Sequence, residues 1–173
     1  MGGDYRSSRP APEPSPGYPD SVAYSTAEAR AEMLDDIGVT ADELAGALAA
    51  LSEAYEALDD DAADELERAV FAPVQAAYGR LRRTHTEFAR RHGLPERTFA
   101  SGSPGAHTGD PRVYIERGLD AADEAEQRLA ELQDSMAPVD VGDPELRAGL
   151  AQTRTLLAEV PAGGRQLLRG FGR

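Results

Sequence analysis

The chain has 173 residues, of which 31 are acidic and 18 basic, so its net charge of −13 and 40% hydrophobic content suit one acidic domain with polar tails. All 18 basic residues are arginine, and neither lysine nor cysteine occurs. This composition excludes phosphate-loop and Schiff-base lysines, disulfides, thiolate catalysis and cysteine-ligated metals.

The first segment, residues 1–24, is rich in Pro, Ser and Gly. Proline lacks a backbone donor and fixes φ, so we predict a disordered tail with polyproline II character. Pro16 and Pro19 have a spacing that proline-reading domains accept, but we interpret the segment as a tether because such spacings arise easily. No apolar run resembles a signal peptide or reaches membrane-spanning length, so we expect a cytoplasmic protein with no membrane contact.

Two helices are predicted next. Ser25 and Glu28 have capping-box spacing and open a short helix over residues 26–37, which Gly38 ends. Thr40 then caps a second helix over residues 41–58. Glu43 completes this second capping box, and Val39 and Leu44 are placed for a hydrophobic staple. Heptad spacing gives this second helix an apolar face of Leu44, Leu48, Leu51, Tyr55 and Leu58.

A long helix is predicted over residues 61–92. Three aspartates, residues 59–61, favour a break and a new N-cap, although one continuous helix over residues 40–92 also fits. Pro73 lacks a donor and crowds the preceding turn, so we expect a kink. The core-facing seam has steps of three and four residues and comprises Phe71, Val74, Tyr78, Leu81, His85, Phe88 and His92.

The second half begins with a long loop over residues 93–110, dense in Gly, Pro, Ser and Thr, which is mobile or functional at that length. Asp110 and Asp143 are each followed by proline, and this pair predicts helices over residues 111–137 and 144–160. The inward faces are predicted to be Ile115, Leu119, Ala122, Leu129, Leu132 and Met136 in the first helix and Leu146, Leu150, Thr153, Leu157 and Val160 in the second. Pro161, Gly163 and Gly164 are expected to end the last helix, leaving a loose basic tail over residues 162–173.

No segment sustains the two-residue alternation of a strand, and aromatic residues make up only 6% of the chain. We therefore predict an all-α, antiparallel up-and-down bundle of four main helices plus a short N-terminal helix, over residues 25–161. Its heptad seams are typical of coiled-coil packing.

Charge alternates along the chain. Residues 26–67 and 113–146 are acidic, whereas residues 68–112 and 147–173 are basic. We expect each basic helix to lie between acidic neighbours, so that the cluster Arg80, Arg82, Arg83, Arg90 and Arg91 serves the electrostatics of the bundle itself. The overall acidity argues against nucleic acid as a partner.

No catalytic constellation is recognisable, and we predict no cofactor and no bound metal. His85 and His92 lie seven residues apart, about 10 Å along a helix, which is too far for one ion. Ser101, Ser103 and His107 lie in the long loop without a nucleophile elbow. No motif in the chain identifies a protein family.

The expected function is therefore a non-enzymatic protein–protein interaction or scaffold module, with an unknown protein or a second copy as partner. The predicted long helices outrun their short neighbours, which leaves apolar surface near His92. The predicted partner-binding residues surround that end: Arg83, His85, Phe88, Arg90, Arg91, His92 and Phe99. The alternative is a ligand- or metal-binding bundle, an enzyme included, that uses His85, His92 and loop residues 94–109.

Overall fold

The computed structural model describes residues 20–170, with side chains described from residue 26 onward. The predicted Pro-rich tail lies mostly outside this range, as do the last three residues of the predicted basic tail. Residues 20–24 were also assigned to the tail, but they form the first turns of a helix. The helical part therefore begins earlier than predicted.

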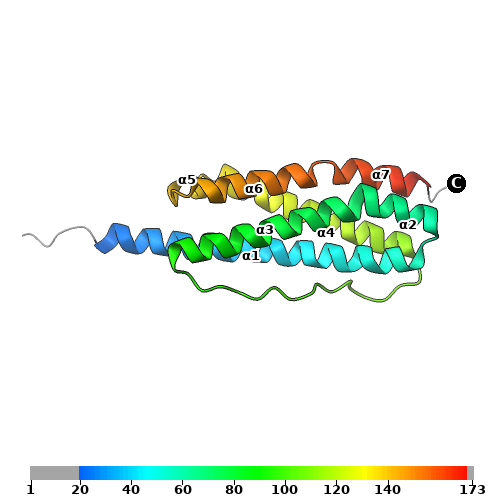
Figure 1. Ribbon diagram of the computed structural model, residues 1–173, viewed down its shortest axis with the longest axis horizontal. Helices are drawn as coiled ribbons and strands as arrows, with labels where there is room; N and C mark the ends of the chain where they lie inside the picture. The colour runs from blue at the N-terminus through cyan, green and yellow to red at the C-terminus, as the bar shows by residue number, and fades with distance from the viewer. Residues whose placement is uncertain (1–19, 171–173) are drawn as a thin grey trace, which may run out of the picture.

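The described residues form an all-α bundle without strands, which confirms the predicted fold class. Four rods lie side by side, made by α1, by α2 with α3, by α4, and by α6 with α7 (Figure 1). The elements are α1 (Asp20–Ala57), α2 (Asp60–Leu66), the π-helical turn η1 (Glu67–Phe71), α3 (Ala72–His92), α4 (Pro111–Asp134), α5 (Ala137–Asp140), α6 (Pro144–Leu157) and α7 (Val160–Gly170).

The first rod is one helix, so the predicted break between residues 37 and 41 is wrong. Thr40 does not cap a new helix, because its Oγ1 donates to the Asp36 carbonyl at 2.8 Å, one turn back in the same helix. Val39 is 47% exposed and forms no staple. Ile37 and Ala41 are fully buried in one stripe, and the burial of that stripe outweighs the local stop signals.

The second rod does start with a break. Asp59 caps α2 by accepting a hydrogen bond from the Ala62 amide at 3.0 Å, as predicted. The irregularity expected at Pro73 is present as the π-helical turn η1, in which the Ala72 amide bonds the Glu67 carbonyl. The predicted seam faces the core, with Val74, Leu81, His85 and Phe88 buried and Phe71, Tyr78 and His92 partly buried. In α1, by contrast, Tyr55 is 39% exposed rather than core-facing.

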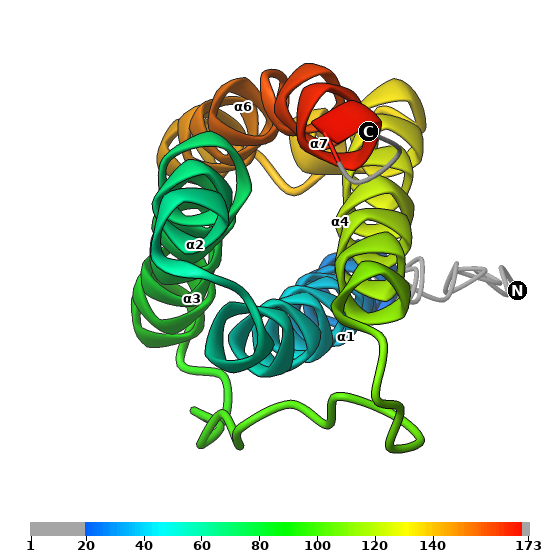
Figure 2. The ribbon, with the colours of Figure 1, turned by 90° about the vertical axis from the view of Figure 1, so that its right-hand side faces the viewer.

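Loop 93–110 is a crossover. It runs along the outer side of α1 from one end of the bundle to the other, so that α3 and α4 point the same way (Figure 1). In the end-on view the order around the bundle is α1, α3, α6–α7 and α4 (Figure 2). Adjacent rods are therefore antiparallel, but the chain does not follow the predicted up-and-down order, because the loop carries it past α1 to the opposite corner.

This order changes the electrostatic neighbours of α3. The basic α3 packs between the acidic α1 and the largely basic α6–α7, whereas the acidic α4 lies diagonally across (Figure 2). The expectation of two acidic neighbours is therefore wrong. The two acidic helices, α1 and α4, instead share the most extensive contact of the bundle. Gly118 lies so close to Leu51 and to the Ala47 carbonyl that no Cβ fits there, so small side chains rather than opposite charges allow this contact.

The last part of the chain differs from prediction in two places. Helix α4 ends at Asp134, and Met136 is 54% exposed with a positive φ of 64°, so it does not point inward. The last helix stops at Leu157, but α7 restarts at Val160 and packs on η1 and α4. The other predicted inward residues of α4 and α6 are buried or partly buried.

Residues 162–170 are therefore helix rather than a loose tail. Gly163 and Gly164 do not terminate the helix; they let α7 approach its neighbours. A Cβ at Gly163 would clash with the Ala69 carbonyl, which Pro73 cannot hydrogen-bond, and one at Gly164 would clash with Leu119. Because α7 extends the fourth rod, it covers the helices that were predicted to outrun their partners.

The bundle end near His92 was predicted to expose apolar surface, and Met136 and Val139 at that end are 54% and 42% exposed. The first turn of α6 and the short α5 close that end, where Pro138, Val141 and Leu146 are buried. In α1, Met33 and Ile37 are buried as well. The interior of this end therefore belongs to the core, while Met136 and Val139 leave apolar surface exposed on its outside.

Candidate functional site

The seven residues predicted to bind a partner occupy three different environments. His85 and Phe88 are buried, with 2% and 0% of their surface exposed, so they cannot meet a partner directly. Arg91 and His92 hold the N-terminus of α6, and Phe99 covers His85 from the crossover loop. Arg83 and Arg90 remain exposed on α3. The set therefore forms no single surface.

Asp143 is the centre of a polar clamp that joins α3 to α6. Its carboxylate, 3% exposed, accepts two hydrogen bonds from Arg91 and one from His92, each at 2.9 Å, and one from the Leu146 amide at 2.8 Å. Burial alone would raise the pKa of Asp143, but the bonds from Leu146, His92 and Arg91 outweigh it and lower that pKa. Because its partners belong to the fold, we interpret Asp143 as structural.

His85 is the most unusual polar residue of the core. Its Nδ1 is buried without a hydrogen-bond partner in the described chain, and Phe99 packs edge-on against its ring with centroids 5.0 Å apart. Burial lowers the pKa of His85 and nearby Arg97 lowers it further, while Asp35 and Asp42 partly offset the shift. The folded state therefore favours the neutral form of His85.

We expect the stability of the fold to decrease as the pH falls from 7.5 to 5. The unfolded chain protonates His85 near its ordinary pKa of 6.5, while the folded chain resists protonation, so the unfolded state binds more protons below that pH. One proton contributes at most about 1.4 kcal/mol per pH unit to this slope. His85→Gln should flatten the slope in urea titrations, whereas the matched variant of exposed His107, His107→Gln, should keep it. A slope unchanged in His85→Gln would contradict the assignment.

The two histidines considered as metal ligands lie in different environments. His92 hydrogen-bonds Asp143, whereas His85 lies under Phe99 of the loop. Between residues 20 and 170, His, Asp and Glu nowhere gather in a group of three that suits an ion. Over the same range no helix is long and apolar enough to cross a membrane.

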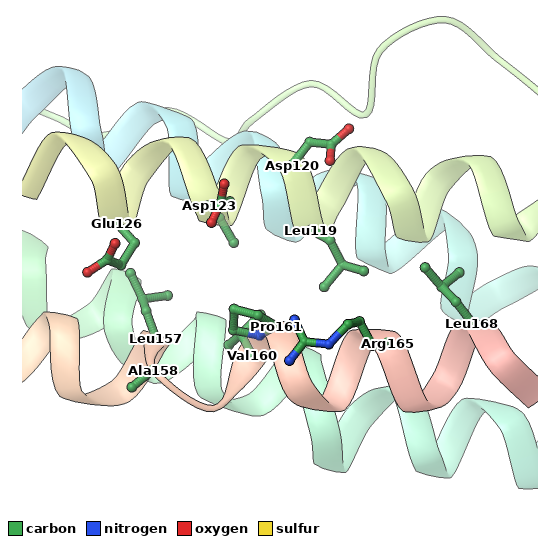
Figure 3. Close-up of a pocket in the computed structure, with 11 residues that line it drawn as sticks. Leu119, Asp120, Asp123, Glu126, Leu157, Ala158, Val160, Pro161, Arg165 and Leu168 are labelled. Carbon is green, nitrogen blue, oxygen red and sulfur yellow. The ribbon is translucent and has the colours of Figure 1, made fainter.

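A groove of 440 Å³ opens between α4 and the junction of α6 and α7 (Figure 3). It exists because α6 stops at Leu157 and the chain makes a turn before α7 begins. Pro161, in the first turn of α7, cannot donate a hydrogen bond back to α6, and this missing bond favours the interruption. The floor is aliphatic and consists of Leu119, Ala122, Leu157, Val160 and Leu168.

Charged side chains form the two rims of this groove. On the α4 rim, Asp120 has no partner within the described residues, and Asp123 is bound by Gln127 of its own helix at 2.6 Å. Glu126 is held by Arg154 across the helices at 2.8 Å. Arg165 stands on the α7 rim (Figure 3), where it pairs with no carboxylate of the described chain. The groove therefore combines an apolar floor with charges that the fold leaves available.

Sequence reasoning missed this groove. The signal was present in Asp120, Asp123 and Glu126, which recur every three residues on α4, and in Pro161 with its following glycines. The prolines and glycines were interpreted as the end of the bundle, so α7 was not expected to provide the second wall.

The α3 arginines are a second exposed feature. Arg82 stacks over Tyr78 and Phe99, with its guanidinium carbon 5.2 Å from each ring centroid. Arg90 reaches only Glu96 of the loop, at 3.7 Å, and Arg83 pairs with no acid of the described residues. Of the predicted cluster, Arg91 therefore pairs with an acid of another helix, through Asp143, and Arg90 pairs with the loop residue Glu96.

Comparison with known proteins yields no relative: no protein-family model, no curated protein and no solved structure matches this chain.

Proposed function

We propose that this protein is a non-enzymatic interaction module, and that another protein docks in the groove between α4 and α6–α7. The observation that carries the proposal is the aliphatic floor between rims that bear free charges. Exposed apolar surface of this kind, bordered by polar residues, commonly marks a protein contact. From its sequence we expect the module to work in the cytoplasm, without nucleic acid.

The two histidines considered as metal ligands are engaged in contacts within the fold, and this supports an interaction role over a metal site. Asp143 satisfies Arg91 and His92, and His85 is covered by the loop. A second copy is a less suitable partner than a different protein. The α3 rod, which carries the exposed Arg83, lies diagonally across the bundle from α4 (Figure 2). A contact between Arg83 of one copy and the groove of another would therefore be head-to-tail and would propagate into open chains.

Site-directed photocrosslinking in the native host tests the proposal. A benzoylphenylalanine at Leu168, in the groove, should give one discrete protein adduct. The same group at Gln75, which is exposed on α3, should not. Because Ala158 lines the groove and is exposed, a probe there should give the same adduct without touching the core. Adducts that are equal at Gln75, or absent from both groove positions, would overturn the proposal.

A further inference from the structure

We infer that the groove between α4 and α6–α7 recognises a basic amphipathic helix, whose apolar stripe covers the floor and whose Lys or Arg side chains meet Asp120 and Asp123. This inference rests on the proposed function and names the chemistry of the partner. The occupant follows from charge, from the shape of the groove and from the chemistry of its floor.

Charge complementarity sets the sign of the partner. Asp120 and Asp123 are exposed carboxylates one helical turn apart, and neither pairs with a cation of the described chain. The protein carries a net charge of −13, so a basic segment is attracted from a distance and an acidic one is repelled. Arg165 on the other rim donates hydrogen bonds to a carboxylate of the partner, which orients the docked segment across the groove.

The groove walls select a helix over other peptide conformations. An extended peptide docks by pairing with an exposed strand, and residues 20–170 contain none. Proline-rich ligands need aromatic-lined grooves, yet every hydrophobic residue that lines this groove is aliphatic or proline. Phosphorylated motifs need clustered arginines, and only Arg165 lines this groove. An amphipathic helix laid between two antiparallel helices is the remaining recognition mode.

The dimensions agree with that mode. The α4 wall extends from Leu119 to Glu126, about 10 Å at 1.5 Å per residue, which accommodates about two turns of a docked helix. On such a helix, basic residues four apart fall on one side and reach the two aspartates, while the apolar residues between them enter the floor. Leu119 and Leu168 are only partly buried in the free protein, so docking removes their exposed surface from water.

The test uses a fluorescein-labelled synthetic helix of 16 residues, built from Leu and Lys, and a matched helix of Leu and Glu. Fluorescence anisotropy with the full chain should show saturable binding of the Lys helix and none of the Glu helix. Asp120→Asn with Asp123→Asn should weaken binding about tenfold, since each exposed charge pair contributes a few-fold. Glu53→Gln with Glu56→Gln removes the same charge from the exposed side of α1 and should change the Kd less than twofold.

Each other outcome has a definite meaning. Equal affinity for the two helices would overturn the inference, because it would show that binding is apolar and does not depend on the charge of the helix. Equal weakening by both variant pairs would also overturn it, because it would show non-specific attraction to the acidic surface rather than recognition at the groove. The rim variants lie on the surface, and an unchanged circular dichroism spectrum confirms that they fold. An adduct at Leu168 with no affinity for the Lys helix would overturn this inference alone. Absence of the adduct would instead contradict the proposed function.

Discussion

Replacing Asp143 with alanine should destabilise the protein by about 3 kcal/mol, enough to lower the melting temperature by about 6–12 °C. The change removes the N-cap of α6, which typically costs about 1 kcal/mol, and leaves Arg91 and His92 without their shared partner. The Arg91 side chain is 33% exposed, so water partly compensates the lost carboxylate, and the expected destabilisation is at the low end for a buried pair.

Two further variants separate the cap from the charge. Asp143→Asn can still cap α6, but it loses the charge, so its stability should fall between those of wild type and Asp143→Ala. Asp110→Ala removes an exposed cap that only the Arg112 amide uses, and it should cost about 1 kcal/mol. Chemical denaturation measures all three. If Asp143→Ala cost no more than Asp110→Ala, the clamp would contribute nothing beyond capping.

Sequence reasoning located the helices where a local signal and the tertiary structure agree. Asp59, Asp110 and Asp143 all cap helices as predicted, because a cap needs only its own side chain and the next amides. Thr40 misled the prediction because its spacing also suits a helix interior, where the hydroxyl bonds back to Asp36. The burial of residues on either side decided between the two, and that burial depends on distant parts of the chain.

The order of the rods lay beyond local signals. Loop 93–110 reaches about 60 Å when extended, so its length is compatible with either a disordered turn or a crossover along the whole bundle. Tertiary contacts between the loop and α1 determine that the loop is a crossover. Arg97 reaches Asp42 at 2.8 Å, and Gly102 rests against the backbone of Ala45. The groove was missed for a different reason: α7 forms its second wall, and Pro161 with the glycines that follow was interpreted as the end of the bundle.

The helical glycines are the sharpest case of a residue whose role depends on distant neighbours. Gly149 in α6 and Gly79 in α3 both lie within regular helix, where glycine alone costs up to about 1 kcal/mol relative to alanine. A Cβ at Gly149 would fall on buried Thr84, 2.7 Å from its Cγ2 and 3.0 Å from its Cβ. At Gly79 the nearest atom is the tip of Arg83, 3.8 Å away. The same substitution should therefore have opposite effects at the two sites.

Gly149→Ala should destabilise the protein by about 2 kcal/mol, because Oγ1, Cγ2 and Cβ of Thr84 all crowd the new methyl group and the two helices must separate. Gly79→Ala should instead stabilise it by about 0.5–1 kcal/mol, since it adds helix propensity without a clash. Urea denaturation of both variants checks the pair, and Thr84→Ala, which removes both Oγ1 and Cγ2, should partly rescue Gly149→Ala. Equal effects at the two glycines, or no rescue by Thr84→Ala, would show that α6 and α3 do not pack as closely as Gly149 permits.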